Sequence, residues 1–319
     1  MSQMNDLPPV ALGAWAWGSG AAGGDQVFGN HFTAADFRSV FAEAVKCGLN
    51  LWDTAAVYGM GASEEILGSI LQERPRDSFM ISTKFTPQIA NLGVSAEEAV
   101  QQMLDGSKKR LRVDYADIYW IHNPADVQRW TPGLIPLAKS GQIKFIGVSN
   151  HNLTEIRNAA EILGKAGLKI AAVQNHYSLL NRSSETAGIL DYCRENGIVF
   201  FAYMVLEQGA LSGKYDAAHP FPAGSDRAKC YGGSLARLGE LVQAMKETGT
   251  KYGASPAQIA EAWAIAKGTL PLIGVTKSAQ VKEAAAAAKI RLQPDEIVRM
   301  EELADKIGVS TIREWEKEM

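Results

Sequence analysis

The 319-residue sequence has few cysteines and no apolar run long enough to cross a membrane. The three cysteines, Cys47, Cys193 and Cys230, are far apart and show neither CxxC nor Cys/His spacing, so neither a disulfide framework nor a zinc site is indicated. No run approaches the roughly 20 apolar residues of a membrane span, and the N-terminus lacks the basic start and apolar stretch of a signal peptide. We therefore predict a cytoplasmic protein without a metal site.

The sequence also lacks an excess of charge of one sign. It contains 32 Lys and Arg against 35 Asp and Glu, a formal net charge of −3. The sequence has no block of basic residues that could bind nucleic acid or an anionic membrane, and we expect neither as a partner. With 46% hydrophobic and 21% charged residues the chain is globular, which excludes disorder. No exposed apolar stripe indicates an oligomeric state.

Eight short runs rich in Val, Ile and Leu alternate with segments of helical spacing, as expected for strands buried on both faces of a parallel sheet. Capping-box pairs open several of these segments, for example Thr33 with Asp36. The regular alternation, without a break in composition, predicts one (β/α)8 barrel domain over residues 1–319. The predicted strands are Val10–Trp15, Leu49–Thr54, Phe79–Phe85, Asp117–His122, Ile143–Val148, Ile170–Gln174, Ile198–Met204 and Leu270–Val275.

Two glycine-containing segments are predicted to be loops at the barrel mouth. Residues 18–23 match GxGxxG, but no helix opens within the motif and no acidic residue ends a second strand about 20 positions later, which argues against a Rossmann fingerprint. We interpret this segment, with Gly24 and Gly29, as an irregular glycine-rich loop. Leu211–Leu235 is predicted to be an extended loop after the seventh strand.

Polar residues follow the predicted strands, where barrel enzymes carry their chemistry. Taken singly, Asp53 could cap a helix, Lys84 could reach the rim and His122 could be a core histidine. Together with Tyr58 they suggest a proton-donating site. A buried Lys84 ammonium would lower the pKa of the Tyr58 phenol toward neutrality, Asp53 would hold the lysine protonated, and His122 would bond a carbonyl oxygen or relay a proton.

In order and spacing, six motifs make the chain resemble an aldo-keto reductase, a (β/α)8 carbonyl reductase that uses NAD(P)H. The motifs are Leu51-Trp52-Asp53-Thr54-Ala55 with Tyr58-Gly59, Ser82-Thr83-Lys84, Ile121-His122-Asn123-Pro124, Gly147-Val148-Ser149-Asn150, Val173-Gln174 with Tyr177, and Gly209-Ala210-Leu211-Ser212-Gly213-Lys214.

The resemblance implies a role for each matching residue. The family's tetrad falls on Asp53, Tyr58, Lys84 and His122, with Tyr58 as the general acid. The resemblance further implies that Ser149, Asn150 and Gln174 hold the nicotinamide carboxamide and that Tyr203 stacks on the ring. The segment after the last strand is similar to the family's phosphate- and adenosine-binding segment, and its candidate residues are Thr276, Lys277, Ser278, Gln280 and Glu283.

We expect NADP as the cofactor, with NAD as the alternative, because Lys277 at a helix start suits a 2′-phosphate. Trp15 and Trp17 flank the end of the first strand and either wall the substrate pocket or close the barrel. The predicted function is reversible reduction of an aldehyde or ketone to an alcohol. Two alternatives are a cofactor-binding regulatory or sensor subunit with slow turnover, and a Schiff-base aldolase that uses Lys84. The pattern does not identify the small-molecule substrate.

Overall fold

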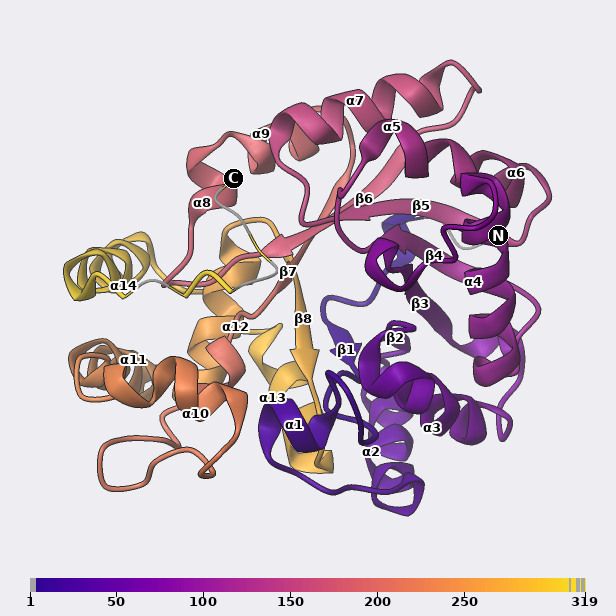
Figure 1. The fold of residues 1–319 in the computed structure, drawn as a ribbon. Coiled ribbons are helices and arrows are strands. Elements are labelled where there is room, and N and C mark those ends of the chain that lie inside the picture. Colours follow the sequence, from indigo (N-terminus) through magenta and orange to yellow (C-terminus); the bar gives the residue numbers. More distant parts are fainter. Residues whose placement is uncertain (1–3, 310, 314–315, 317–318) are drawn as a thin grey trace.

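A computed structural model describes residues 4–309, 311–313, 316 and 319. Its eight parallel strands close into a barrel in sequence order, with helices around the outside (Figure 1). This confirms the predicted fold class. The strands are β1 (Ala11–Gly13), β2 (Leu51–Asp53), β3 (Met80–Phe85), β4 (Ala116–Ile121), β5 (Ile143–Ser149), β6 (Ile170–His176), β7 (Val199–Tyr203) and β8 (Leu270–Gly274).

Helices of very different length connect and cover the strands. The α-helices are α1 (Gly24–Phe28), α2 (Ala34–Cys47), α3 (Ala62–Leu71), α4 (Ala96–Leu111), α5 (Val127–Trp130), α6 (Leu134–Lys139), α7 (Leu153–Gly164), α8 (Ser183–Thr186), α9 (Ile189–Glu195), α10 (Asp226–Tyr231), α11 (Gly239–Tyr252), α12 (Pro256–Ala266), α13 (Ser278–Ala287) and α14 (Pro294–Ile307). The 3-10 turns are η1 (Met4–Asp6), η2 (Tyr58–Gly61), η3 (Arg76–Ser78), η4 (Pro87–Ile89), η5 (Thr131–Gly133), η6 (Glu207–Gly209) and η7 (Gly232–Ser234).

The predicted helix boundaries have identifiable local causes. At the start of α2, the Thr33 backbone N–H donates to the Asp36 carboxylate over 2.7 Å. Ser95 caps α4 by accepting from the Glu98 backbone N–H. Gly48 ends α2 in the left-handed region at φ 70°, which glycine adopts without steric cost.

Large side chains fill the barrel interior. Trp120 and Phe201 are almost fully buried there and meet edge to face, with ring centroids 5.3 Å apart. Gly147 on β5 makes room for the indole, because a Cβ at that position would lie 2.1 Å from a Trp120 ring carbon. The interior is therefore a packed core rather than a pore, and chemistry is confined to the ends of the strands.

Both predicted mouth loops contain helical structure that sequence reasoning missed. The glycine-rich segment does not stay irregular: α1 occupies residues 24–28 and ends at Gly29, which has a φ of 67°. Within Leu211–Leu235, α10 begins where the Ser225 side chain accepts from the Ala228 backbone N–H, and η7 follows. The predictions were wrong here because single capping residues opened or closed helices only one or two turns long.

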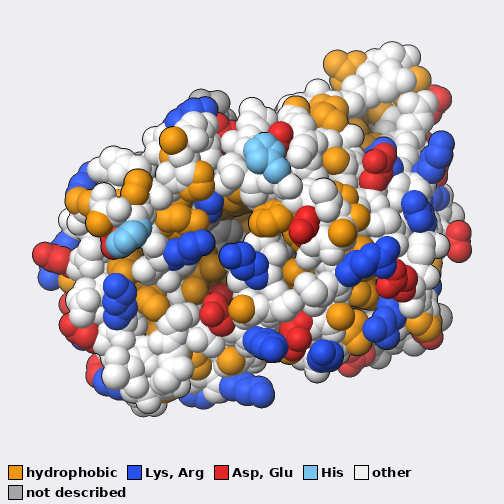
Figure 2. All heavy atoms as spheres, turned by 90° about the horizontal axis from the view of Figure 1, so that it is seen from below, with side chains coloured by type: hydrophobic (Ala, Val, Ile, Leu, Met, Phe, Trp, Pro, Cys, Tyr) orange, Lys and Arg blue, Asp and Glu red, His pale blue; other side chains and the backbone are white. Residues whose placement is uncertain are grey.

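The molecular surface carries charges of both signs. Seen from below the view of Figure 1, Lys and Arg side chains alternate with Asp and Glu, and the surface is hollowed near its centre (Figure 2). Within the described ranges, no helix combines the length and the apolar character needed to cross a membrane.

Candidate active site

Lys84 and Asp53 form a buried ion pair at the carboxyl ends of β3 and β2. The Lys84 side chain is fully buried, and its ammonium donates to the Asp53 carboxylate and, over 2.9 Å, to the Thr54 backbone carbonyl. Burial disfavours the ammonium, but the charge and hydrogen bond of Asp53, together with the contact to Tyr58, outweigh it, so the pKa of Lys84 is raised. The lysine therefore stays protonated, as the sequence suggested.

A second layer of hydrogen bonds fixes the Asp53 carboxylate. The Ser82 hydroxyl donates to Asp53 Oδ1 over 2.6 Å, and the Trp120 indole N–H in turn donates to the Ser82 oxygen. Gln174 also donates to Asp53 Oδ1, over 3.2 Å. Sequence reasoning missed the contributions of Ser82 and Trp120. The only available signal was that Ser82 lies two residues before Lys84 and so points to the same face of the strand.

The Tyr58 phenol lies beside the Lys84 ammonium. The two polar atoms are 3.4 Å apart, and the ammonium is 5.0 Å from the centre of the phenol ring. Burial raises the pKa of Tyr58, and the opposing effect of Lys84 is too small to reverse this. The structure thus places the pKa of the phenol above its ordinary value rather than at the lowered value expected from the sequence, so Tyr58 is neutral here.

His122 follows β4 and completes the group. Its Nδ1 lies 2.9 Å from the Thr86 hydroxyl, and its ring meets the Tyr58 ring edge to face. Burial and the nearby Lys84 charge hold the pKa of His122 well below its ordinary 6.5. The imidazole is therefore neutral at physiological pH and can share one hydrogen bond with a bound oxygen.

The four residues predicted for the nicotinamide end lie on, or directly after, the adjacent strands β5, β6 and β7. Asn150 has a φ of 60° and donates to the His122 carbonyl over 2.9 Å. Its Oδ1 lies 2.5 Å from the Tyr203 hydroxyl, and Gln174 contacts Asp53. The Ser149 hydroxyl is buried, and no described side chain or backbone group bonds it. A buried hydroxyl without a partner fits a site for a polar ligand group such as a carboxamide.

The residues predicted for the adenosine end share one loop and helix start. Gln280 Oε1 accepts from the backbone N–H groups of Thr276 and Lys277 over 2.7 and 2.9 Å, so this side chain closes the first turn of α13. Lys277 and Glu283 are exposed, and Ser278 is half-buried. The structure therefore assigns Gln280 a capping contact and leaves the Lys277 side chain at the surface.

The two tryptophans near β1 have different surroundings. The half-buried Trp15 stacks on Tyr58, with ring centroids 5.5 Å apart, and therefore lies beside the candidate proton donor. Trp17 is completely buried, stacks on Phe37 and donates its indole N–H to the Val275 carbonyl over 2.7 Å. Trp17 is thus a packing residue against α2, with no exposed surface to offer a substrate.

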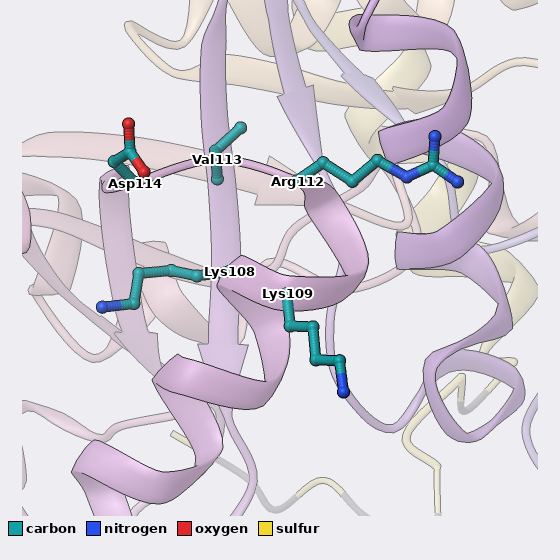
Figure 3. A pocket seen from close by; sticks show the side chains of 5 residues that line it. All are labelled: Lys108, Lys109, Arg112, Val113 and Asp114. Atoms are coloured by element: carbon teal, nitrogen blue, oxygen red, sulfur yellow. The ribbon is translucent and has the colours of Figure 1, made fainter.

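A surface depression elsewhere on the molecule lacks these features. It lies where α4 ends, before the amino end of β4, and its side chains point in different directions (Figure 3). In barrels of this architecture that end contributes stability, whereas chemistry takes place at the carboxyl ends. The lining residues are Lys108, Lys109, Arg112, Val113 and Asp114.

Comparison with known proteins identifies the family to which the chain belongs. The family model described as Aldo/keto reductase family matches residues 9–305. The chain belongs to this family. An aldo-keto reductase of Schizosaccharomyces pombe, whose name includes NADP(+), is 29% identical over 310 residues, covering 92% of this chain and 89% of that protein. An NADH-specific methylglyoxal reductase of Escherichia coli is 29% identical over 323 residues, covering 94% and 96%.

Solved structures share the fold of this aldo/keto reductase. The glycerol dehydrogenase from Gluconobacter oxydans has a TM-score of 0.77 and 26% identity, and the match covers 97% of this chain and 94% of that one. An aldo-keto reductase from Klebsiella pneumoniae in complex with NADPH has a TM-score of 0.70 and 23% identity, with 93% and 91% covered. The second likeness supports the fold alone.

Proposed function

We propose that this aldo/keto reductase uses NADPH to reduce an aldehyde or ketone to an alcohol, with Tyr58 as the proton donor. The observation that carries the proposal is the position of one buried ammonium, on Lys84, between a carboxylate and a neutral phenol. Such an arrangement supplies a proton to an oxygen without a nucleophile.

The cofactor assignment rests on the site and on the relatives. The unbonded Ser149 hydroxyl, with Asn150 and Gln174 beside it, offers donors and acceptors for a carboxamide. Tyr203 offers a ring face next to them. When bound, the nicotinamide supplies the hydride. One relative is named for NADP(+) and another for NADH. The exposed Lys277 at the start of α13 favours NADPH, since its ammonium can pair with a 2′-phosphate.

In the proton step the Tyr58 O–H bond breaks and the proton passes to the carbonyl oxygen of the substrate. The phenolate that remains is stabilised by the Lys84 ammonium 3.4 Å away, and Asp53 keeps that ammonium charged. His122 is neutral, so its imidazole can bond the substrate oxygen without competing for the charge. Trp15, stacked on Tyr58, would form one wall for the substrate.

The structure disfavours the Schiff-base alternative. A lysine nucleophile must lose its proton, but Asp53 holds Lys84 protonated and the raised pKa opposes that loss. A cofactor-binding sensor would also bind NADPH tightly. It differs from the proposed enzyme only in its slow turnover of carbonyl substrates.

A panel of carbonyl compounds, followed by the absorbance of NADPH with NADH in parallel, tests the proposed function. We expect steady oxidation of NADPH with at least one class among sugars, small dicarbonyls, steroids and aromatic aldehydes, and slower oxidation of NADH. Tight NADPH binding measured by calorimetry, with negligible turnover across the panel, would instead favour the sensor.

A further inference from the structure

The C-terminal tail reaches the candidate nicotinamide pocket through Glu316. One oxygen of its buried carboxylate lies 2.7 Å from the Tyr203 hydroxyl, and the other lies 2.8 Å from His176 Nδ1. Tyr203, at the end of β7, and Glu316 are 113 positions apart in the sequence. The Glu316 carboxylate therefore contacts the hydroxyl of Tyr203, the residue on whose ring the nicotinamide is proposed to stack.

A closed set of opposite charges anchors Glu316. His176 lies between Glu316 and Glu207, with 2.8 Å from its Nε2 to the Glu207 carboxylate. Burial disfavours the imidazolium, but the two carboxylates outweigh it and raise the pKa of His176 to about 10. Arg313 adds hydrogen bonds rather than an ion pair: its backbone N–H donates to Glu316 over 3.1 Å, and its guanidinium donates to the Gln208 amide oxygen over 2.8 Å.

The loop that follows β7 is held in place by the same set. The hydroxyls of Ser178 and Tyr231 donate to the Glu207 carboxylate, which is fully buried. Met204 and Glu207 have φ values of 61° and 46°, which non-glycine residues rarely adopt. The cluster thus stabilises a strained backbone directly after Tyr203, so the position of this ring depends on it.

The Tyr203 hydroxyl has one proton and two acceptors within reach. Asn150 Oδ1 lies 2.5 Å away and Glu316 Oε1 lies 2.7 Å away. A charged carboxylate is the stronger acceptor. The Asn150 amide nitrogen donates to the His122 carbonyl, and its Oδ1 has two lone pairs, one of which the Tyr203 hydroxyl occupies when it donates there. With the tyrosine proton on Glu316, both lone pairs are open to a ligand N–H.

We propose that Glu316 is a positioning residue for the cofactor: it accepts the Tyr203 proton and thereby frees Asn150 Oδ1 to accept from the nicotinamide carboxamide. This proposal rests on the proposed function, because it assigns the carboxamide to Asn150. Glu316 acts through Tyr203 and His176 and need not touch the cofactor itself. Glu316 is then part of the support beneath the cofactor pocket.

Calorimetric titration of Glu316→Gln with two probes tests the proposal. NADPH reports both ends of the cofactor, whereas adenosine 2′,5′-bisphosphate lacks the nicotinamide and reports only the adenosine end. We expect Glu316→Gln to bind NADPH about tenfold more weakly and to bind the bisphosphate within about twofold of wild type. Glu302→Gln, an equal change of charge at an exposed position on α14, should alter neither affinity.

A double-variant cycle identifies the route of the effect. In a Tyr203→Phe background, which keeps the ring and removes the competing hydroxyl, Glu316→Gln should weaken NADPH by less than about twofold. Tyr203→Phe alone should keep NADPH affinity within about threefold of wild type, and this comparison stands even if Glu316→Gln does not fold.

Three results would overturn the proposal: unchanged NADPH affinity in Glu316→Gln, equal losses for both probes, or an undiminished effect in the Tyr203→Phe background. A wild-type protein that binds neither probe would instead overturn the proposed function.

Discussion

The Lys84 Nζ lies 3.4 Å from the Tyr58 hydroxyl oxygen, and on its other side it contacts the Asp53 carboxylate. The three residues differ in burial: Lys84 and Asp53 are almost completely enclosed, whereas Tyr58 as a whole residue keeps part of its surface exposed. The charged residues are therefore kept from water, whereas the candidate proton donor is not fully enclosed. In the proposed reaction, Lys84 and Asp53 would therefore act through their charges and Tyr58 through its proton.

Lys84→Met should destabilise the fold as well as the activity. The substitution leaves the buried Asp53 carboxylate without its cation, which typically costs about 3–5 kcal/mol. We expect urea unfolding at neutral pH to show a loss of that order, and carbonyl reduction to fall at least about a hundredfold. Adding Asp53→Asn should restore part of the stability but none of the rate. If Lys84→Met alone were as stable as wild type, the ion pair could not have the stabilising role described here.

Ser82→Ala tests the support beneath Asp53. The variant removes one hydrogen bond to the carboxylate and leaves the Trp120 indole N–H without its acceptor. The expected loss in the free energy of unfolding is about 1–3 kcal/mol, measured by urea titration. Ser78→Ala, whose hydroxyl bonds only the local Pro75 carbonyl at an exposed position, is the matched control and should be nearly neutral. Equal losses in both variants would contradict the support role.

Glu261→Gln should stabilise the protein at alkaline pH. Burial, with a smaller effect of Glu283, raises the pKa of Glu261 to about 8, and no described group bonds its Oε2. Between its ordinary value of 4.5 and 8 the folded state binds a proton that the unfolded state lacks, so this residue lowers stability as pH rises.

Thermal unfolding at several pH values checks this prediction. The glutamine variant should be more stable than wild type by about 1–3 kcal/mol near pH 8.5, and the difference should vanish near pH 4. A difference that is independent of pH would show that the titration of Glu261 is not its cause.

Lys277→Ala tests the preference for NADPH. If the exposed ammonium pairs with the 2′-phosphate, the variant should bind NADPH about tenfold more weakly and NADH with nearly unchanged affinity. Lys289→Ala, at another exposed position just beyond α13, is the control for loss of one positive charge. Calorimetry with both cofactors distinguishes the outcomes. Equal losses of affinity for NADPH and NADH would contradict a contact between Lys277 and the 2′-phosphate.

The barrel could be predicted because it depends on short-range patterns, and the proximity of three of the candidate tetrad residues follows from it. Alternating strand and helix signals fix the order of the elements, and a parallel barrel brings all carboxyl ends to one face, so that Asp53, Lys84 and His122 meet. The short helix α1 was missed because a single left-handed glycine, Gly29, is a weak signal.

Two other features depend on contacts distant in sequence. Trp17 lies close to a strand end, but its indole turns inward to a carbonyl 258 positions away. Glu316 reaches Tyr203 across 113 positions. No local periodicity marks either contact, and the direction of each side chain is decided by the partner that it finds on folding.

Tyr58→Phe measures the central claim most directly. The variant keeps the ring that stacks on Trp15 and removes only the proton donor, so NADPH affinity measured by calorimetry should stay within about threefold of wild type. The rate of carbonyl reduction, followed by NADPH absorbance with the best substrate of the panel, should fall by about 10²–10⁴-fold. A Tyr58→Phe protein that binds NADPH normally and retains most of its reduction rate would contradict the account.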